Sequence, residues 1–213
     1  MNTKALTAEF VGTFALIFIG AGAGAIGVGG LVGVALAHGL VLMAVAAAYG
    51  PISGAHINPA VTIALWAGRQ IKTAEALGYI AVQLLGGIAA AFVLRFVLGG
   101  TSSGLGATVL ASGVSPAQGL VVEAVLTFFL VNTIYNTAVS GKAGNLAPVA
   151  IGMTLAFSIL MGGPLTGGSL NPARTIGPAV ATGNYSDLWV YLAGPVLGGL
   201  VAAWLYQGVL RRL

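Results

Sequence analysis

Long apolar runs alternate with short polar or glycine-rich segments along the whole chain. Six runs are long enough for a helix to cross a hydrocarbon core of about 30 Å, which takes roughly 20 residues. They lie at about 5–27, 31–50, 73–98, 117–139, 146–163 and 188–210. The pattern therefore predicts an all-α membrane protein with six transmembrane helices, and the short connections predict a single domain over 1–213.

Two further apolar runs, at about 57–67 and 171–181, are too short to span a membrane. Each follows a turn rich in glycine and serine. At about 1.5 Å per residue, a helix of this length covers roughly half of the hydrocarbon core. We expect each run to enter from one side and to stop near the middle, as a re-entrant half-helix.

The chain also matches itself at an offset of 112 to 114 residues. Residues 9–14 match 123–128, residues 58–62 match 171–175, and residues 79–87 match 191–199. Three matches in one order and one register indicate a duplication. Because each repeat, about 1–98 and 117–213, holds three spans, the second repeat begins on the opposite side of the membrane. The sequence predicts an inverted repeat.

The amino-acid composition excludes several classes of protein. Only 6% of the residues are charged and the mean hydropathy is +1.01, whereas soluble domains are about one quarter charged. One Asp, two His and no Cys leave little material for a catalytic triad or a metal site. We therefore expect no enzyme, no cofactor and no metal site. The net charge of +4 is scattered and forms no basic stripe, so we expect no nucleic-acid partner.

The scattered basic residues instead indicate orientation. Most of them fall at the chain ends and in loops that the alternation of spans places on one side: Lys4, Arg69, Lys72, Lys142, Arg211 and Arg212. The positive-inside rule makes that side cytoplasmic, with both termini. Short loops and the lack of an extended tail favour a plasma (inner) membrane of bacterial type.

Two copies of the tripeptide Asn-Pro-Ala open the short helices, at Asn58-Pro59-Ala60 and Asn171-Pro172-Ala173. Asn is a good N-cap and Pro suits the first helical position. In an inverted repeat the two helix N-termini meet near the membrane midplane, where each contributes about half a positive charge. Such a site repels cations, including protons, and offers amide N–H groups to a passing oxygen.

Arg174 lies on the first turn of the second short helix. An arginine near the membrane interior costs several kcal/mol unless it is paired or lines a water-filled path. Pairing with backbone carbonyls is one reading. We favour the other, in which Arg174 forms part of a pore wall.

The two Asn-Pro-Ala motifs, the lead-in at residues 53–58 and Arg174 together resemble the aquaporin (major intrinsic protein) family. The resemblance covers essentially the whole chain. It implies a right-handed six-helix bundle with two re-entrant half-helices, a pore in each protomer, and a homotetramer in the lipid bilayer.

The same resemblance implies a narrow external selectivity filter, which ungapped spacing from the motifs places at His38, Ile159, Gly168 and Arg174. Strict water channels usually carry Phe and His at the first two positions, so this set is more similar to plant vacuolar (tonoplast intrinsic) channels, some of which pass ammonia or urea. Gly168 has no side chain and Ile159 has no aromatic ring, so both should widen the filter. Thr175 and Ala179 stand where glycerol-conducting relatives tend to carry Asp and a basic residue, and they favour the water-channel branch.

Two buried carboxylates, Glu9 and Glu123, suggest either a proton relay or structural support. The resemblance implies that they accept hydrogen bonds from the re-entrant loops, and that His56 is a packing residue of its loop. The favoured hypothesis is a passive channel for water that excludes protons and ions, with ammonia, urea or another small neutral solute left open. The alternatives are a glycerol-type facilitator and a proton-coupled carrier.

Overall fold

The computed structural model describes residues 2–212, and within that range the chain is helical and contains no β-strand. Six helices or helix combinations are long and apolar enough to cross a membrane: Thr3–Ile26, Gly30–Ser53, Thr73–Val97, Pro116–Val139, Gly144–Thr166 and Leu188–Gly208. Each ends within a few residues of a predicted run. The prediction of six spans is therefore confirmed.

Several of these spans consist of more than one helical segment. The first joins α1 (Thr3–Leu16), η1 (Ile17–Ala21) and α2 (Gly22–Ile26); the fourth joins α6 (Pro116–Ile134) and η3 (Tyr135–Val139); the fifth begins with η4 (Gly144–Leu146) and continues as α7 (Ala147–Thr166). The other three are α3 (Gly30–Ser53), α5 (Thr73–Val97) and α9 (Leu188–Gly208). Short 3₁₀ turns, η2 (Gly104–Gly106) and η5 (Leu210–Arg212), lie outside the spans.

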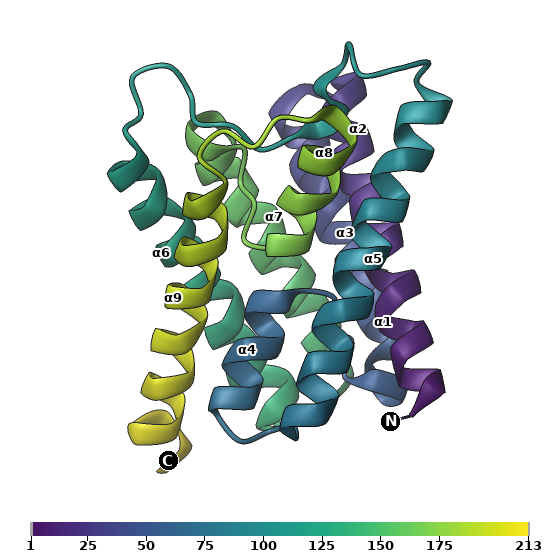
Figure 1. Cartoon of the computed structure of the whole chain (residues 1–213). Coiled ribbons are helices and arrows are strands. Elements are labelled where there is room, and N and C mark those ends of the chain that lie inside the picture. The colour runs from purple at the N-terminus through teal and green to yellow at the C-terminus, as the bar shows by residue number, and fades with distance from the viewer. Residues whose placement is uncertain (1, 213) are drawn as a thin grey trace.

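The two predicted short helices form α4 (Pro59–Ala67) and α8 (Pro172–Thr182). In Figure 1, α4 lies in the half of the bundle that holds both chain termini, and α8 lies in the opposite half. Both are surrounded by the long helices, with α8 packed on α5 and α4 packed on α9. Each half-helix therefore packs on the last span of the other repeat.

Glycines at matching positions of α5 and α9 allow close packing between spans. A Cβ on Gly86 would lie 2.5 Å from the carbonyl oxygen of Phe10 in α1, and a Cβ on Gly198 would overlap the carbonyl oxygen of Ala124 in α6. Membrane helices associate through this kind of backbone approach because burying apolar surface gains little in lipid. Large apolar side chains are accordingly exposed on the outer surface, among them Leu77, Phe96 and Trp204.

Two π-helical turns, η1 and η3, were not predicted. Such turns insert one residue into a helix and often occur at functional sites. The turn η3 lets the buried Tyr135 hydroxyl donate to the Ala64 carbonyl of α4 at 2.8 Å. The turn η1 places Gly20 directly against the His38 ring. Because these helices are apolar on nearly all sides, no hydrophobic periodicity marks the inserted residue.

Candidate pore and selectivity filter

The asparagine of each Asn-Pro-Ala motif caps its own half-helix and donates a hydrogen bond to the loop residue that precedes the other motif. Asn58 Oδ1 accepts from the Ala60 N–H at 2.8 Å and Asn171 Oδ1 accepts from the Ala173 N–H at 2.9 Å, so both side chains cap their helices. Asn58 Nδ2 donates to the Leu170 carbonyl at 2.8 Å, and Asn171 Nδ2 donates to the Ile57 carbonyl at 2.9 Å. Each Nδ2 group has two hydrogens, so one remains for a solute.

Pro59 and Pro172 occupy the first helical positions, as their spacing predicts. The residues that follow, Ala60 and Ala173, are buried and donate the capped N–H groups. The two helix N-termini thus face each other across a pair of side chains. Their combined partial charges make this point of the molecule unfavourable for a cation.

A buried glutamate supports each loop that leads into a half-helix. Glu9 Oε1 accepts from the His56 N–H at 2.9 Å, and Glu9 Oε2 accepts from the Ile57 N–H at 2.6 Å. Glu123 accepts from the Ser169 and Leu170 N–H groups at 2.9 and 2.7 Å. Without these acceptors, the donors would be unsatisfied at membrane depth, at a cost of several kcal/mol each.

The same bonds hold an uncommon backbone conformation. Ile57 and Leu170 have φ angles of +54° and +55°, in the left-handed region that side chains larger than glycine seldom adopt. Such residues cost of order 1–3 kcal/mol each and persist where their surroundings fix them. Both are fully buried next to a capping asparagine. The strained turn therefore places the carbonyl of each residue within reach of the asparagine of the other loop.

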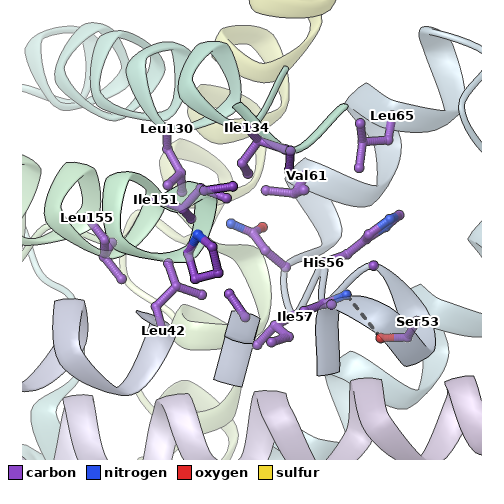
Figure 2. A pocket seen from close by; sticks show the side chains of 18 of the residues that line it. Leu42, Ser53, His56, Ile57, Val61, Leu65, Leu130, Ile134, Ile151 and Leu155 are labelled. Carbon is purple, nitrogen blue, oxygen red and sulfur yellow. Dashed lines mark hydrogen bonds between the residues drawn. The ribbon is translucent and has the colours of Figure 1, made fainter. Parts of the chain in front are cut away.

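A cavity of about 740 Å³ runs past both asparagines toward the end of the bundle that holds the termini. Figure 2 shows part of its lining, with the apolar Leu42, Ile151 and Leu155 on one side and His56 on the other. At one end the lining includes His38 and Arg174, and at the other Gln70 and Asn145. A mostly apolar lining with polar side chains at intervals is suited to small solutes passing in file.

His38 places one ring nitrogen on its own helix and leaves the other free. Nδ1 lies 2.9 Å from the Val34 carbonyl oxygen, which only accepts, so the ring hydrogen belongs on Nδ1. Nε2 is buried and has no hydrogen-bond partner among the described residues. In the neutral ring, Nε2 is then an acceptor available to a solute.

Arg174 combines the two roles that its sequence position left open. Its Nη1 donates to the Gly106 carbonyl at 2.5 Å, and the residue also lines the cavity. Its Nε has no hydrogen-bond partner within residues 2–212. The guanidinium is thus held by a backbone oxygen on one side and keeps a free N–H donor on the other.

Ile159 and Gly168 lie against each other. A Cβ on Gly168 would lie 3.2 Å from Ile159 Cγ1, and both residues are buried. Neither belongs to the cavity lining, which stops one residue short of Gly168, at Ser169. Of the four predicted filter residues, the structure therefore places His38 and Arg174 on the cavity and Ile159 beside Gly168.

His56 packs within its loop and also lines the cavity. Its Nδ1 lies 3.2 Å from Thr62 Oγ1, and its ring packs edge-on against Tyr79, with centroids 5.1 Å apart. Gln83 Nε2 donates to both Thr62 Oγ1 and Glu9 Oε2, at 2.9 and 2.8 Å. The His56 side chain is therefore held in place by neighbours on α4 and α5.

Three contributors to the site were not predicted from the sequence. Gly106 and Thr108 lie in the loop that joins α5 to α6, called the external loop below, and Arg95 of α5 donates to the Ala181 carbonyl at the end of α8, 3.2 Å away. A sequence signal in the loop is Leu105, an apolar residue between two glycines, which is fully buried. For Arg95, the signal is its match with Gln207, which donates to the Gly68 carbonyl of α4 at 2.8 Å.

Comparison with known proteins gives a consistent result. A sequence model of the family described as major intrinsic protein matches residues 1–206. Aquaporin TIP2-1 of Arabidopsis thaliana is 42% identical, with 98% of this chain and 88% of the relative aligned. Aquaporin TIP1-2 of Zea mays is also 42% identical, over 97% of this chain and 85% of the relative.

A solved structure agrees with these sequence matches. The X-ray structure of the aquaglyceroporin from Plasmodium falciparum superimposes with a TM-score of 0.86 and 25% identity, covering 99% of this chain and 97% of that one. The family match and the shared fold both extend over nearly the full length, and the paired half-helices lie where a solute would cross. We conclude that the protein belongs to the major intrinsic protein family, as an integral, multi-pass membrane protein that forms a passive water channel.

Proposed function

We propose that this channel passes small neutral solutes such as urea and ammonia in addition to water, and that it excludes protons and other ions. The observation that carries the proposal is the pair of free nitrogens on the cavity-lining residues His38 and Arg174. One is an acceptor and the other a donor. A neutral molecule that both donates and accepts hydrogen bonds satisfies both, whereas a purely apolar solute satisfies neither.

Two features support exclusion of ions. The N-termini of α4 and α8 and the Arg174 guanidinium all carry positive potential toward the solute path. The rest of the path is largely apolar, and its described lining residues include no carboxylate that could replace water around a dehydrated cation. In this proposal Asn58 and Asn171 orient the file of solutes, while His38, Ile159, Gly168 and Arg174 form the selectivity filter that sets the size limit.

A glycerol-type facilitator is the first alternative. Thr175, one of the residues that favour the water-channel branch, uses its hydroxyl for bonds to Ser169 and Thr108, at 2.7 and 2.8 Å. A larger or charged residue would not fit this arrangement without displacing the external loop. This observation supports a filter built for solutes smaller than glycerol.

A proton-coupled carrier is the second alternative. The pair of buried glutamates suggested this hypothesis. Each of them, however, accepts hydrogen bonds from at least two backbone N–H groups and one side chain. The donors are Ser53, His56, Ile57 and Gln83 for Glu9, and Thr166, Ser169 and Leu170 for Glu123. A carboxylate that accepts this many hydrogen bonds stabilises the re-entrant loop that donates them. The structural role of Glu9, Glu123 and His56 is therefore the one we propose.

We further propose that residues 1–213 form one channel domain of two inverted repeats, that the protein assembles as a homotetramer with a pore in each protomer, and that it resides in a plasma (inner) membrane with both termini cytoplasmic. Both chain ends lie at the same end of the bundle in Figure 1, and this arrangement and the basic residues in loops on that side support the orientation.

Stopped-flow light scattering on proteoliposomes tests the solute range. Vesicles shocked with urea shrink as water leaves and reswell as urea enters, and a glycerol shock provides the comparison. We expect faster shrinkage than in protein-free vesicles, faster reswelling with urea, and no faster reswelling with glycerol. Faster shrinkage alone would restrict the channel to water. Uphill solute movement driven by a pH gradient would instead indicate a coupled carrier.

A further inference from the structure

The external loop carries a hydroxyl that reaches the half-helix α8. Thr108 is buried, and its Oγ1 lies 2.8 Å from Thr175 Oγ1. Thr175 is the residue directly after Arg174 in α8. The contact therefore joins the loop to the first turn of the helix that carries the filter arginine.

The direction of this hydrogen bond follows from its neighbours. Ser169 Oγ donates to the Asn171 carbonyl at 3.0 Å and lies 2.7 Å from Thr175 Oγ1. A hydroxyl has only one hydrogen, so Thr175 donates to Ser169 and Thr108 donates to Thr175. The result is a directed chain of three hydroxyls from the external loop to the cap of α8.

The same loop segment holds Arg174 through its backbone. The Gly106 carbonyl accepts from Arg174 Nη1, and Gly106 lies two residues before Thr108. Leu105 is fully buried, and the Ala111 N–H donates to the Leu165 carbonyl of α7 at 2.9 Å. The position of the oxygen that holds Arg174 therefore depends on how this segment is fastened to the bundle.

The other half of the pore fastens the corresponding threonine differently. Thr62, which matches Thr175, contacts His56 and the α5 side chain Gln83. At the position that matches Gln83, α9 carries Pro195, which has no polar side chain. In the outer half, a loop residue thus takes the place that a spanning helix fills in the inner half.

We propose that Thr108 is a positioning residue for the selectivity filter: its hydroxyl bond to Thr175 fixes the external loop so that the Gly106 carbonyl holds Arg174 in place. This inference rests on the filter role proposed above for Arg174. It makes solute selectivity depend on a loop side chain that touches no solute.

The test compares Thr108→Val, which removes the hydroxyl at nearly constant shape, with Thr108→Ser, which keeps it. Thr101→Val, at an exposed site in the same loop, is the matched control. The readout is the ratio of urea to water permeability in proteoliposomes. We expect T108V to raise this ratio about fivefold, the factor that one ordinary hydrogen bond corresponds to, and T108S and T101V to leave it unchanged.

A double variant isolates the hydroxyl pair. If Thr108 acts through Thr175, then adding T108V to Thr175→Val changes the ratio no further. Thr108→Ala is the second variant where T108V fails to insert. An unchanged ratio in conducting T108V and T108A channels, or additive effects with T175V, would overturn the role of Thr108 and leave the channel function intact.

Failure of the proposed solute range looks different. A wild-type channel that passes water and no urea would overturn that range, while urea flux appearing only in T108V would still support the role of Thr108. Wild-type vesicles with no water permeability above protein-free vesicles would count against the open channel itself.

Discussion

The outer and inner ends of the pore occupy equivalent places in the two repeats but carry different side chains. The residues proposed as the selectivity filter, His38, Ile159, Gly168 and Arg174, correspond at the offset of 113 residues to Ile151, Ala46, Ala55 and Val61. All four inner residues line the cavity. The outer set thus includes a guanidinium and an imidazole group, whereas the four equivalent inner residues are all apolar.

The scaffold behind these two ends has changed far less. Tyr79 donates to the Ser53 carbonyl and Tyr191 to the Thr166 carbonyl, both at 2.9 Å. Thr13 and Thr127 donate to the carbonyls of the two buried glutamates, both at 2.7 Å. The comparison teaches that a duplicated membrane fold preserves the groups that satisfy its backbone.

The largest expected effect comes from breaking the shared scaffold. In Glu123→Gln, the new amide group faces a backbone N–H where the carboxylate accepted one. We expect a loss of about 3 kcal/mol in the free energy of unfolding and a loss of water permeability. Thermal unfolding in detergent measures the first and stopped-flow scattering the second.

Glu9→Gln sharpens this result because Glu9 has one more side-chain partner, Gln83. Its cost should be at least as large. Glu75→Gln serves as the control, because Glu75 accepts from the Tyr79 hydroxyl and, within the described part of the chain, from no backbone N–H group of a re-entrant loop. Unfolding temperatures for E123Q and E75Q that agree would contradict the supporting role of Glu123.

The second effect concerns the charge at the outer end. Arg174→Val introduces at the outer end the residue type of Val61, which occupies the equivalent inner position. We expect urea permeability to rise about tenfold, equivalent to about 1.4 kcal/mol, and a proton leak to appear, because the positive potential and the polar constriction are both lost. A pH-sensitive dye inside the vesicles reports the leak.

Val61→Ala, at the equivalent inner position, is the control for this prediction and should leave the proton leak at the wild-type level. If R174V conducts water with an unchanged solute profile and no leak, ion exclusion at the outer end does not depend on Arg174.

The third effect concerns the imidazole. His38→Ile copies Ile151 and removes the acceptor Nε2. We expect the ratio of urea to water permeability to fall about fivefold, as for one lost hydrogen bond. Ile151→Val should not change the ratio. A ratio that is unchanged or raised in H38I would show that the width of the filter outweighs its hydrogen bonding.

The smallest effect concerns the ends of the half-helices. Arg95→Gln places at α8 the same donor that Gln207 provides at α4, so we expect a change within about 0.5 kcal/mol in the free energy of unfolding. Arg95→Leu removes the donor and should cost about 1 kcal/mol. Thermal unfolding distinguishes them. Equal stabilities for R95Q and R95L would mean that the Ala181 carbonyl needs no partner.

The sequence by itself determined the six spans, the two half-helices and their helix caps. Run length, N-cap chemistry and helix-start proline act over a few neighbouring residues, and a membrane leaves a backbone few alternatives to the helix. The internal match made the inverted arrangement predictable as well, since three spans per repeat reverse the second copy.

Only the tertiary structure decided how the site is held together. Arg174 meets Gly106 across 68 residues of chain, and Thr108 meets Thr175 across 67. No local pattern encodes such meetings. The π-helical turns that bring Gly20 to His38 and Tyr135 to α4 leave no mark on helices that are apolar all round. The sequence thus indicated four residues that line the cavity, His38, Asn58, Asn171 and Arg174, while packing between distant segments decided their partners.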